Sequence, residues 1–193
     1  MSIRESVSVR AMHQNNHKEP AELLKNHLNL FTGSDLPGPV LDLACGSGRN
    51  GLFLAEHGLD VIFYDRNREK LDLIEKTARA RKLKVSTQAV DLESGRTDFL
   101  PADFFGAVIV FRYLHRPLIP ALKESVRSRG LIVYETFTLK QAKIGKPSNP
   151  DFLLQDNELK TWFGDWEIIH YFEGGKSSPP QYVAQIIARK KHF

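Results

Sequence analysis

The sequence predicts a doubly wound α/β fold, with a mostly parallel seven-stranded sheet and an antiparallel hairpin at its C-terminal end. Strand-like and helix-like segments alternate from residue 40 to residue 134, which is typical of a parallel sheet covered by helices on both faces. The strand-like segments are short, continuous apolar runs, as expected for strands that are buried on both sides. The last two are joined by a Gly- and Pro-rich connection without a helix, so we expect them to pair as a hairpin.

Local signals define each element in turn. Pro20 opens a helix with an apolar face from Leu23 to Phe31, and a loop over 32–39 separates it from the main body. Gly58 ends the helix after the first strand, and Asn67 caps the next helix. Further helices are expected from Pro117 to about residue 127 and over 157–163. The predicted strands are 40–45, 61–64, 85–90, 107–111, 131–134, 166–172 and 182–189.

The ends of the chain and one internal loop fall outside this alternation. Residues 1–18 are polar without periodicity and indicate either a mobile arm or a segment that orders on a ligand. We therefore expect an N-terminal arm and helix over 1–35 and a single domain over 36–193. Within that domain, the loop 138–156 is either a lid that brings lysines to a ligand or a disordered loop with solvated lysines.

The composition indicates an ordinary globular protein. The chain has 193 residues and 27 Lys and Arg against 23 Asp and Glu, a formal net charge of +4. Its 41% hydrophobic content excludes a disordered or collagen-like chain, and the single cysteine, Cys45, excludes a disulfide scaffold. No apolar run approaches the roughly 20 residues that span a bilayer, and residues 1–18 lack the apolar core of a secretory signal. We expect a cytoplasmic protein, with no membrane partner.

A glycine-rich loop follows the first predicted strand. Residues 46–51, GSGRNG, fit the pattern G-x-G-x-x-G, which by itself suggests a nicotinamide or flavin dinucleotide. Three observations argue against that ligand: Asp42 lies inside the strand, where a carboxylate suits a cation better than a pyrophosphate; the sheet ends in an antiparallel hairpin; and the next two strands end in Asp65 and Asp91, at the edge where open α/β sheets bind ligands.

The segment 40–50, VLDLACGSGRN, resembles the first motif of class I S-adenosylmethionine-dependent methyltransferases, and the run GRN followed by LFLAEHG resembles the tellurite-resistance-type branch of that family. The resemblance covers about residues 36–137 in order, and the terminal hairpin is also as that fold expects. It implies a Rossmann-like methyltransferase fold and S-adenosyl-L-methionine as the cofactor, with S-adenosyl-L-homocysteine as the product. The cofactor-binding residues that it implies are Asp42, Leu43, Ala44, Gly46, Ser47, Gly48, Asn50, Asp65, Arg66, Asp91, Leu92, Phe111 and Arg112.

The resemblance gives several of these residues a specific role. Asp42 would interact with the positively charged amino group of the methionine part, directly or through water, and Asp65 would accept hydrogen bonds from both ribose hydroxyls. Asp91 would meet the adenine edge, with Phe111 on the other side of the cofactor. Each has a structural alternative: the glycines serve only a tight turn, Asp65 caps the helix that it precedes, and Asp91 is a turn residue. Cys45 is expected to be a small buried hydrophobe rather than a nucleophile.

The segment after the fourth strand normally faces the acceptor in this fold. Here it supplies Arg112, Tyr113, His115 and Arg116, which could receive a small anion or activate a protonated nucleophile. His115 is our first candidate for a general base, although His115 and Arg116 could instead simply cap the approach to the next helix. Glu135, at the end of strand five, either orients a polar acceptor or pairs with Arg112. The candidate catalytic residues are His115, Arg112, Tyr113 and Glu135.

From the resemblance and these residues we expect an enzyme that methylates a small-molecule acceptor, either an oxyanion or a thiol-like nucleophile. The segment 111–117 lacks the Asn/Asp/Ser-Pro-Pro-Tyr/Phe sequence of amino-methylating enzymes. The alternatives are an RNA or protein methyltransferase with a basic surface, a non-catalytic cofactor-binding regulatory module, and an oxidoreductase. The seven histidines are scattered, so no metal site is expected. The expected assembly is a monomer or a homodimer.

Overall fold

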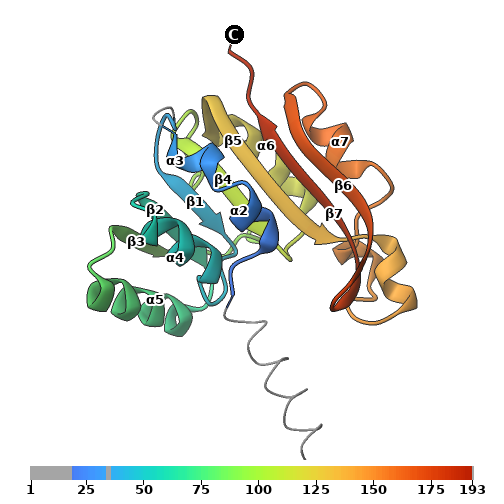
Figure 1. The fold of residues 1–193 in the computed structure, drawn as a ribbon, viewed down its shortest axis with the longest axis horizontal. Coiled ribbons are helices and arrows are strands. Elements are labelled where there is room, and N and C mark those ends of the chain that lie inside the picture. Colours follow the sequence, from blue (N-terminus) through green and yellow to red (C-terminus); the bar gives the residue numbers. More distant parts are fainter. Residues whose placement is uncertain (1–18, 34–35, 193) are drawn as a thin grey trace, which may run out of the picture.

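A computed structural model describes residues 19–33 and 36–192, so the predicted arm over 1–18 lies outside the described residues. Seven strands form one sheet in the order β3-β2-β1-β4-β5-β7-β6 (Figure 1). Neighbouring strands from β3 to β5 pair in parallel, and β7 pairs antiparallel with both β5 and β6. The predicted mixed sheet with a terminal antiparallel hairpin is confirmed. Its strands are β1 (Val40–Leu43), β2 (Val61–Asp65), β3 (Val85–Ala89), β4 (Phe105–Phe111), β5 (Val126–Phe137), β6 (Glu167–Ser177) and β7 (Pro180–Arg189).

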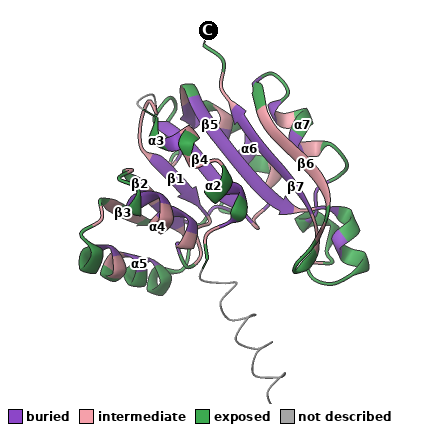
Figure 2. Cartoon of the chain, viewed as in Figure 1, coloured by how far each residue is buried: buried purple, intermediate pink, exposed green. Residues whose placement is uncertain are grey.

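Helices cover both faces of this sheet, as the apolar strands require. All seven residues of β4 are buried, and alternate residues enter opposite cores: Val108 and Val110 join one, Ala107 and Ile109 the other. Figure 2 shows the buried centre of the sheet in purple. One core is closed by α6 (Ile119–Ser125) and α7 (Glu158–Phe163); the other by α2 (Glu22–Asn26), α3 (Asn29–Thr32), α4 (Arg49–Glu56) and α5 (Arg68–Arg81). None of the helices in the described part of the chain is long and apolar enough to cross a membrane.

The N-terminal helix differs from the prediction. The single helix expected from Pro20 to Phe31 is two short helices, α2 and α3, separated at His27 and Leu28. Asparagine and histidine, which occupy residues 26, 27 and 29, have low helix propensity, so an uninterrupted helix gains little here. Leu24 and Phe31 are nevertheless almost fully buried, at 0% and 1% exposure, so both segments pack against the sheet.

The connection between α6 and β5 also differs. The helix expected to reach residue 127 ends at Ser125, and β5 begins at Val126 rather than at residue 131. Val126 is fully buried and pairs with Phe105, so the burial of this valine favours an early start of the strand. The sheet register shifts just beyond that pair, and Arg129 takes up the irregularity with a φ of +66°. Both hairpin strands are also longer than expected, because their pairing continues past Gly174 and Gly175.

Candidate functional site

Two cavities open at the edge of the sheet where β1, β2 and β4 end. The carboxyl ends of parallel strands are where open α/β sheets bind their ligands. The first cavity has a volume of about 340 Å³, and the second about 310 Å³. Residues implied by the resemblance form much of the first: its lining is Ala44, Gly46, Asp65, Arg66, Lys70, Val90, Asp91, Leu92, Glu93, Arg112 and Tyr113.

The glycines of the loop serve different purposes. Gly46 has a φ of +56°, and a Cβ at this position would meet nothing within 4 Å, so the bare backbone faces open space on the cavity wall. Gly48 has a φ of +72°, and its Cβ would lie 2.6 Å from the side chain of Ile74 on α5. A Cβ at Gly51 would overlap the ring of Phe63. Gly46 therefore opens the loop to a ligand, whereas Gly48 and Gly51 allow close packing beneath it.

Asp65 links this loop to the second strand. One carboxylate oxygen accepts from the backbone nitrogen of Gly46 at 2.8 Å, and the other accepts from the backbone nitrogen of Asn67 at 2.9 Å. The helix cap itself is Asn67, whose side chain accepts from Lys70. Asp65 thus fixes the loop while it lines the cavity, and each of its oxygens keeps a lone pair for a ligand.

Asp42 lies beneath the loop and not on the cavity wall. It is 2% exposed, and its carboxylate accepts from the backbone nitrogen of Gly51 at 2.9 Å. Burial raises the pKa of Asp42 to about 7, and the Gly51 hydrogen bond and the charge of Arg49 oppose that rise. The structure therefore gives Asp42 a position under the turn between β1 and α4 rather than direct access to a ligand.

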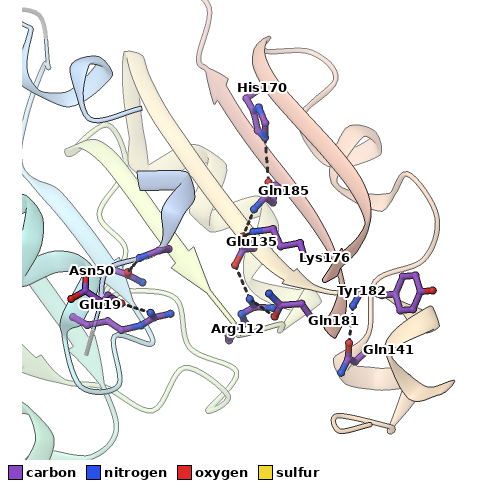
Figure 3. Close-up of polar contacts among 12 residues, drawn as sticks. Glu19, Asn50, Arg112, Glu135, Gln141, His170, Lys176, Gln181, Tyr182 and Gln185 are labelled. Carbon is purple, nitrogen blue, oxygen red and sulfur yellow. Dashed lines mark hydrogen bonds and ion pairs between the residues drawn. The ribbon is translucent and has the colours of Figure 1, made fainter. Parts of the chain in front are cut away.

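Other residues implied by the resemblance also support the loop from behind. Asn50 is buried, and its side chain accepts from the backbone nitrogen of Ala21 at 2.9 Å, which attaches α4 to the segment before α2 (Figure 3). Leu43 and Phe111 belong to the two cores, and neither they nor Ser47 and Gly48 line either cavity. These positions hold the shape of the wall.

Cys45 packs as a small hydrophobe, although it is half-buried rather than buried as the sequence predicts. Burial raises the pKa of its thiol, and the nearby carboxylates of Asp42 and Asp65 raise it further. The side chain packs against the core under α4 and α5. The thiol therefore stays protonated at neutral pH, which does not suit a nucleophile.

The second cavity adjoins the first along a common wall. Glu93, Arg112 and Tyr113 line both cavities. The remaining lining of the second is mostly apolar. Leu114 follows β4, and the other residues come from β5 and the loop after it: Thr136, Phe137, Pro147 and Phe152. Two cavities that share a wall can hold a donor and an acceptor side by side, with the apolar residues excluding water from the acceptor side.

Arg112 occupies the centre of the common wall. It has a φ of +60°, and its backbone nitrogen donates to the carbonyl of Glu135 at 2.8 Å. Its Nη2 lies 3.0 Å from the carboxylate of Glu135 and donates to the side chain of Gln181 at 2.8 Å (Figure 3). The guanidinium also lies 4.4 Å from the centre of the Phe137 ring. Its Nη1 is buried without a hydrogen-bond partner in the described part of the chain.

Glu135 pairs with Arg112, which is one of the two roles expected for it. Glu135 is 3% exposed and lines neither cavity. Lys176 from β6 lies 3.2 Å from its second carboxylate oxygen, and the side chain of Gln185 from β7 donates to the same oxygen. In turn, Gln185 contacts the ring of His170 at 3.3 Å (Figure 3). Glu135 is therefore part of a buried polar cluster behind Arg112.

Tyr113 presents its hydroxyl at the common wall. The hydroxyl is buried and has no hydrogen-bond partner among the described residues. Burial raises the pKa of Tyr113, and the carboxylates of Glu93 and Asp91 raise it further. The phenol therefore stays protonated and can only donate its proton in a hydrogen bond or accept one, so it does not suit the role of a base.

His115 and Arg116 do not meet the other candidates. Neither residue lines either of the two cavities; Arg116 begins η1 (Arg116–Leu118), and His115 directly precedes it. Arg116 forms a two-pronged ion pair with Glu158 at 2.6 and 2.9 Å and donates to the carbonyls of Asp151 and Leu153. Arg116 thus attaches the start of α7 and the preceding loop to η1, and it is not free to receive an anion.

The loop 138–156 is ordered and attached to the sheet. It contains η2 (Leu139–Lys143) and η3 (Pro150–Phe152), and Thr138 forms a bridge with Leu154. The side chain of Gln141 accepts from the backbone nitrogen of Tyr182 at 2.8 Å (Figure 3). It also donates to the carbonyl of Lys146 at 3.1 Å. The disordered alternative is therefore wrong, and the residues that this loop brings to the second cavity are apolar rather than its lysines.

Some site residues carry no signal that the sequence reasoning used. Glu93 follows Asp91 by two positions and could have been found as part of the same turn after β3. Thr136 and Phe137 directly follow Glu135, which was singled out. Gln181 and Lys176 lie far along the chain in the hairpin, and only the antiparallel pairing of β7 with β5 brings them to this edge.

The chain is similar in sequence to proteins of one family. A family model described as "Tellurite resistance protein TehB" matches residues 13–176. A curated protein from Haemophilus influenzae, "Probable S-adenosyl-L-methionine-dependent methyltransferase TehB", is 31% identical over 143 residues, which cover 71% of this chain and 49% of that protein. The chain thus spans about half the length of the curated TehB relatives that it matches.

Solved structures show the same fold. The crystal structure of TehB from Haemophilus influenzae superposes with a TM-score of 0.67 at 25% identity, covering 86% of this chain and 62% of that one. The N-methyltransferase NodS from Bradyrhizobium japonicum superposes with a TM-score of 0.67 at 14% identity, covering 94% of this chain and 98% of that one. The predicted Rossmann-like methyltransferase fold is confirmed.

Proposed function

Because the chain belongs to the TehB family, we propose that it transfers a methyl group from S-adenosylmethionine to a small anionic acceptor, with tellurite as the first acceptor to test. The observation that carries this proposal is the common wall of the two cavities. Arg112 and Tyr113 both stand in that wall: among the described residues Nη1 of Arg112 has no hydrogen-bond partner, and the Tyr113 hydroxyl is buried near the carboxylate of Glu93. A cation and a neutral donor at one place suit an oxyanion.

The first cavity suits a cationic cofactor. Asp65, Asp91 and Glu93 line it with carboxylates, and Gly46 offers bare backbone on the same wall. Asp65 retains a lone pair on each oxygen, so it can accept from two adjacent hydroxyls of a ribose. Leu92 and Val90 give an apolar surface for a purine ring beside Asp91. S-adenosylmethionine supplies an activated methyl group on a positively charged sulfur.

The second cavity suits the acceptor. Nη1 of Arg112 and the hydroxyl of Tyr113 donate to its oxygens, while Phe137, Phe152 and Leu114 exclude water. A lone pair of the acceptor forms the bond to the methyl carbon as the carbon–sulfur bond breaks, and its electron pair remains on sulfur as the neutral thioether. An acceptor with a free lone pair needs no proton transfer, so the site can work by positioning and water exclusion alone.

The test combines binding and turnover. Calorimetry measures the affinity for S-adenosylmethionine, and chromatography measures S-adenosylhomocysteine formed with tellurite, a small thiol or bulk RNA as the acceptor. We expect cofactor binding in the micromolar range and product formation that depends on tellurite and falls in the variant Arg112→Lys. No cofactor binding, or turnover with RNA alone, would contradict the proposal.

A further inference from the structure

A buried carboxylate behind the second cavity contacts one of the side chains that line it. Glu135 of β5 is 3% exposed and contacts the side chains of Arg112, which follows β4, of Lys176 in β6 and of Gln185 in β7 (Figure 3). Of these, only Arg112 lines a cavity. An influence of Glu135 on a ligand therefore has to pass through Arg112.

The contacts of Arg112 determine where its free nitrogen points. Nη2 lies 3.0 Å from the Glu135 carboxylate and 2.8 Å from the Gln181 side-chain oxygen, and the guanidinium lies over the Phe137 ring at 4.4 Å. A guanidinium is planar, so two contacts at Nη2 together with one face on an aromatic ring leave Nη1 a single direction. Removing the Glu135 contact releases that restraint.

Both oxygens of the Glu135 carboxylate contact protein groups. Arg112 takes one oxygen, and Lys176 and Gln185 share the other. The ring of His170 contacts the amide oxygen of Gln185 at 3.3 Å, which orients the amide nitrogen toward Glu135. Two cations and one carboxylate leave one positive charge in the cluster. Glu135 thus suits neither the role of a base nor a direct contact with an acceptor.

We propose that Glu135 is a positioning residue, which holds Arg112 so that Nη1 faces the acceptor in the second cavity. The inference rests on the proposed function, since it assigns to that acceptor the free nitrogen of Arg112. For a variant without the carboxylate, an argument from charge alone and an argument from position predict opposite changes in the affinity for the anionic acceptor. Removing a negative charge from the cluster should attract an anion more strongly, whereas loss of position should weaken its binding.

The variant Glu135→Gln decides between these two effects. We expect the affinity of this variant for tellurite, measured by calorimetry with S-adenosylhomocysteine bound, to be about 10- to 100-fold lower than that of the wild type. Its affinity for S-adenosylhomocysteine should change by less than about threefold. In turnover, KM for tellurite should rise more than kcat falls. Tighter or unchanged tellurite binding would overturn the inference.

A double-mutant cycle tests whether Glu135 acts through Arg112. In the background Arg112→Ala, the added change Glu135→Gln should cause no further loss of tellurite affinity, because the group that Glu135 positions is gone. If the double variant instead lost the product of the two single-variant factors in tellurite affinity, Glu135 would act on the acceptor independently of Arg112, and the inference would be overturned. The variant Lys176→Met is the charge control, and we expect it to lose less affinity than Glu135→Gln.

A spectroscopic readout is independent of any acceptor. In nitrogen-15 spectra of arginine side chains, the Arg112 guanidinium, assigned with Arg112→Lys, should rotate slowly in the wild type and rapidly in Glu135→Gln. Equal rotation rates in the two proteins would overturn the inference even if tellurite failed to bind. Failure of wild-type protein to bind tellurite, with the guanidinium restrained, would instead overturn the proposed acceptor.

A milder variant guards against a folding defect in Glu135→Gln. Gln181→Ala removes the other contact of Nη2 at a half-buried position, and far-ultraviolet circular dichroism with thermal unfolding checks each fold. We expect Gln181→Ala to stay folded and to lose tellurite affinity about threefold. No loss in this variant, together with none in Glu135→Gln, would leave Arg112 positioned without either group and would refute the proposal.

Discussion

The two cavities that meet at Arg112 are built in different ways. The first is formed by short turns after β1, β2 and β3, where backbone groups and neighbouring side chains contact each other, as Asp65 contacts Gly46. The second is formed by side chains that come together only when the sheet is complete, as when Arg112 meets Gln181, 69 residues along the chain. The comparison teaches that the first cavity is shaped by turns at neighbouring strand ends, whereas the hairpin holds in place the arginine at the centre of the second.

The largest expected effect is on the cofactor side. We expect Asp65→Ala to weaken S-adenosylhomocysteine binding about 100-fold, because it removes the ribose acceptor and releases the backbone nitrogen of Gly46. Calorimetry measures the change. Asp91→Ala is the matched control, with an expected loss of about 10-fold, since Asp91 bonds only within its own turn. Equal losses in the two variants would contradict the role given to Asp65.

The next effect sharpens the contrast with the acceptor side. We expect Arg112→Lys to lower kcat/KM for tellurite about 30-fold, because an ammonium lacks the planar head that contacts Glu135 and Gln181 through one nitrogen and directs another nitrogen elsewhere. Steady-state kinetics and calorimetry should show a change of less than about threefold in cofactor affinity. A loss confined to cofactor binding would place Arg112 on the first cavity alone.

A stability measurement tests the packing beneath the cofactor loop. We expect Gly48→Ala to lower the free energy of unfolding by about 2 kcal/mol more than Gly46→Ala. Both positions have a positive φ, but only a Cβ at Gly48 would overlap Ile74. Urea unfolding measures the free energy of unfolding of both variants, and the difference between them separates the effect of the overlap from that of backbone strain. Equal stabilities would show that α5 yields without cost.

The last effect concerns the pH dependence of Asp42. Its pKa is raised from 3.8 to about 7 by burial, so between these values the folded protein keeps a proton that the unfolded chain has released. The contribution of Asp42 to the free energy of unfolding therefore falls as the pH rises from 4 to 7. We expect Asp42→Asn, which can still accept from Gly51, to become more stable than wild type as the pH rises across that range, by at most about 1.4 kcal/mol for each pH unit.

Urea unfolding between pH 4 and pH 8 measures this difference. The gain of Asp42→Asn should be absent near pH 4, should grow toward pH 7 and should be constant above it. A difference that does not vary with pH would show that Asp42 ionises normally under the loop.

Most of the fold could be predicted from local patterns. The alternation of apolar runs and helices predicts the parallel strands, and the Gly- and Pro-rich connection predicts the hairpin. The errors lie where packing overrides local signals: Val126 joins β5 rather than extending α6, and His27 lies at the break between α2 and α3. The spacing of apolar residues does not show whether a residue such as Val126 will pack as part of a strand or of a helix.

The two cavities also differ in how far local sequence patterns predict their residues. Residues that line the first cavity, such as Gly46, Asp65 and Asp91, follow strands directly and were found from the sequence. In the second, Arg112 and Tyr113 were found but Phe152 was not, and neither was Gln181, which contacts Arg112 from the hairpin without lining the cavity. Contacts between segments far apart in the chain bring both residues to this region. His115 was chosen for its chemistry, and the geometry turns it away from both cavities.

The most direct test of the common wall is a crystal structure with S-adenosylhomocysteine and tellurite, in which anomalous scattering locates tellurium. The account predicts the sulfur in the first cavity and tellurium in the second, with an oxygen of the anion within about 3 Å of Nη1 of Arg112. Tellurium bound away from Arg112, or the sulfur facing away from the second cavity, would contradict transfer across this wall.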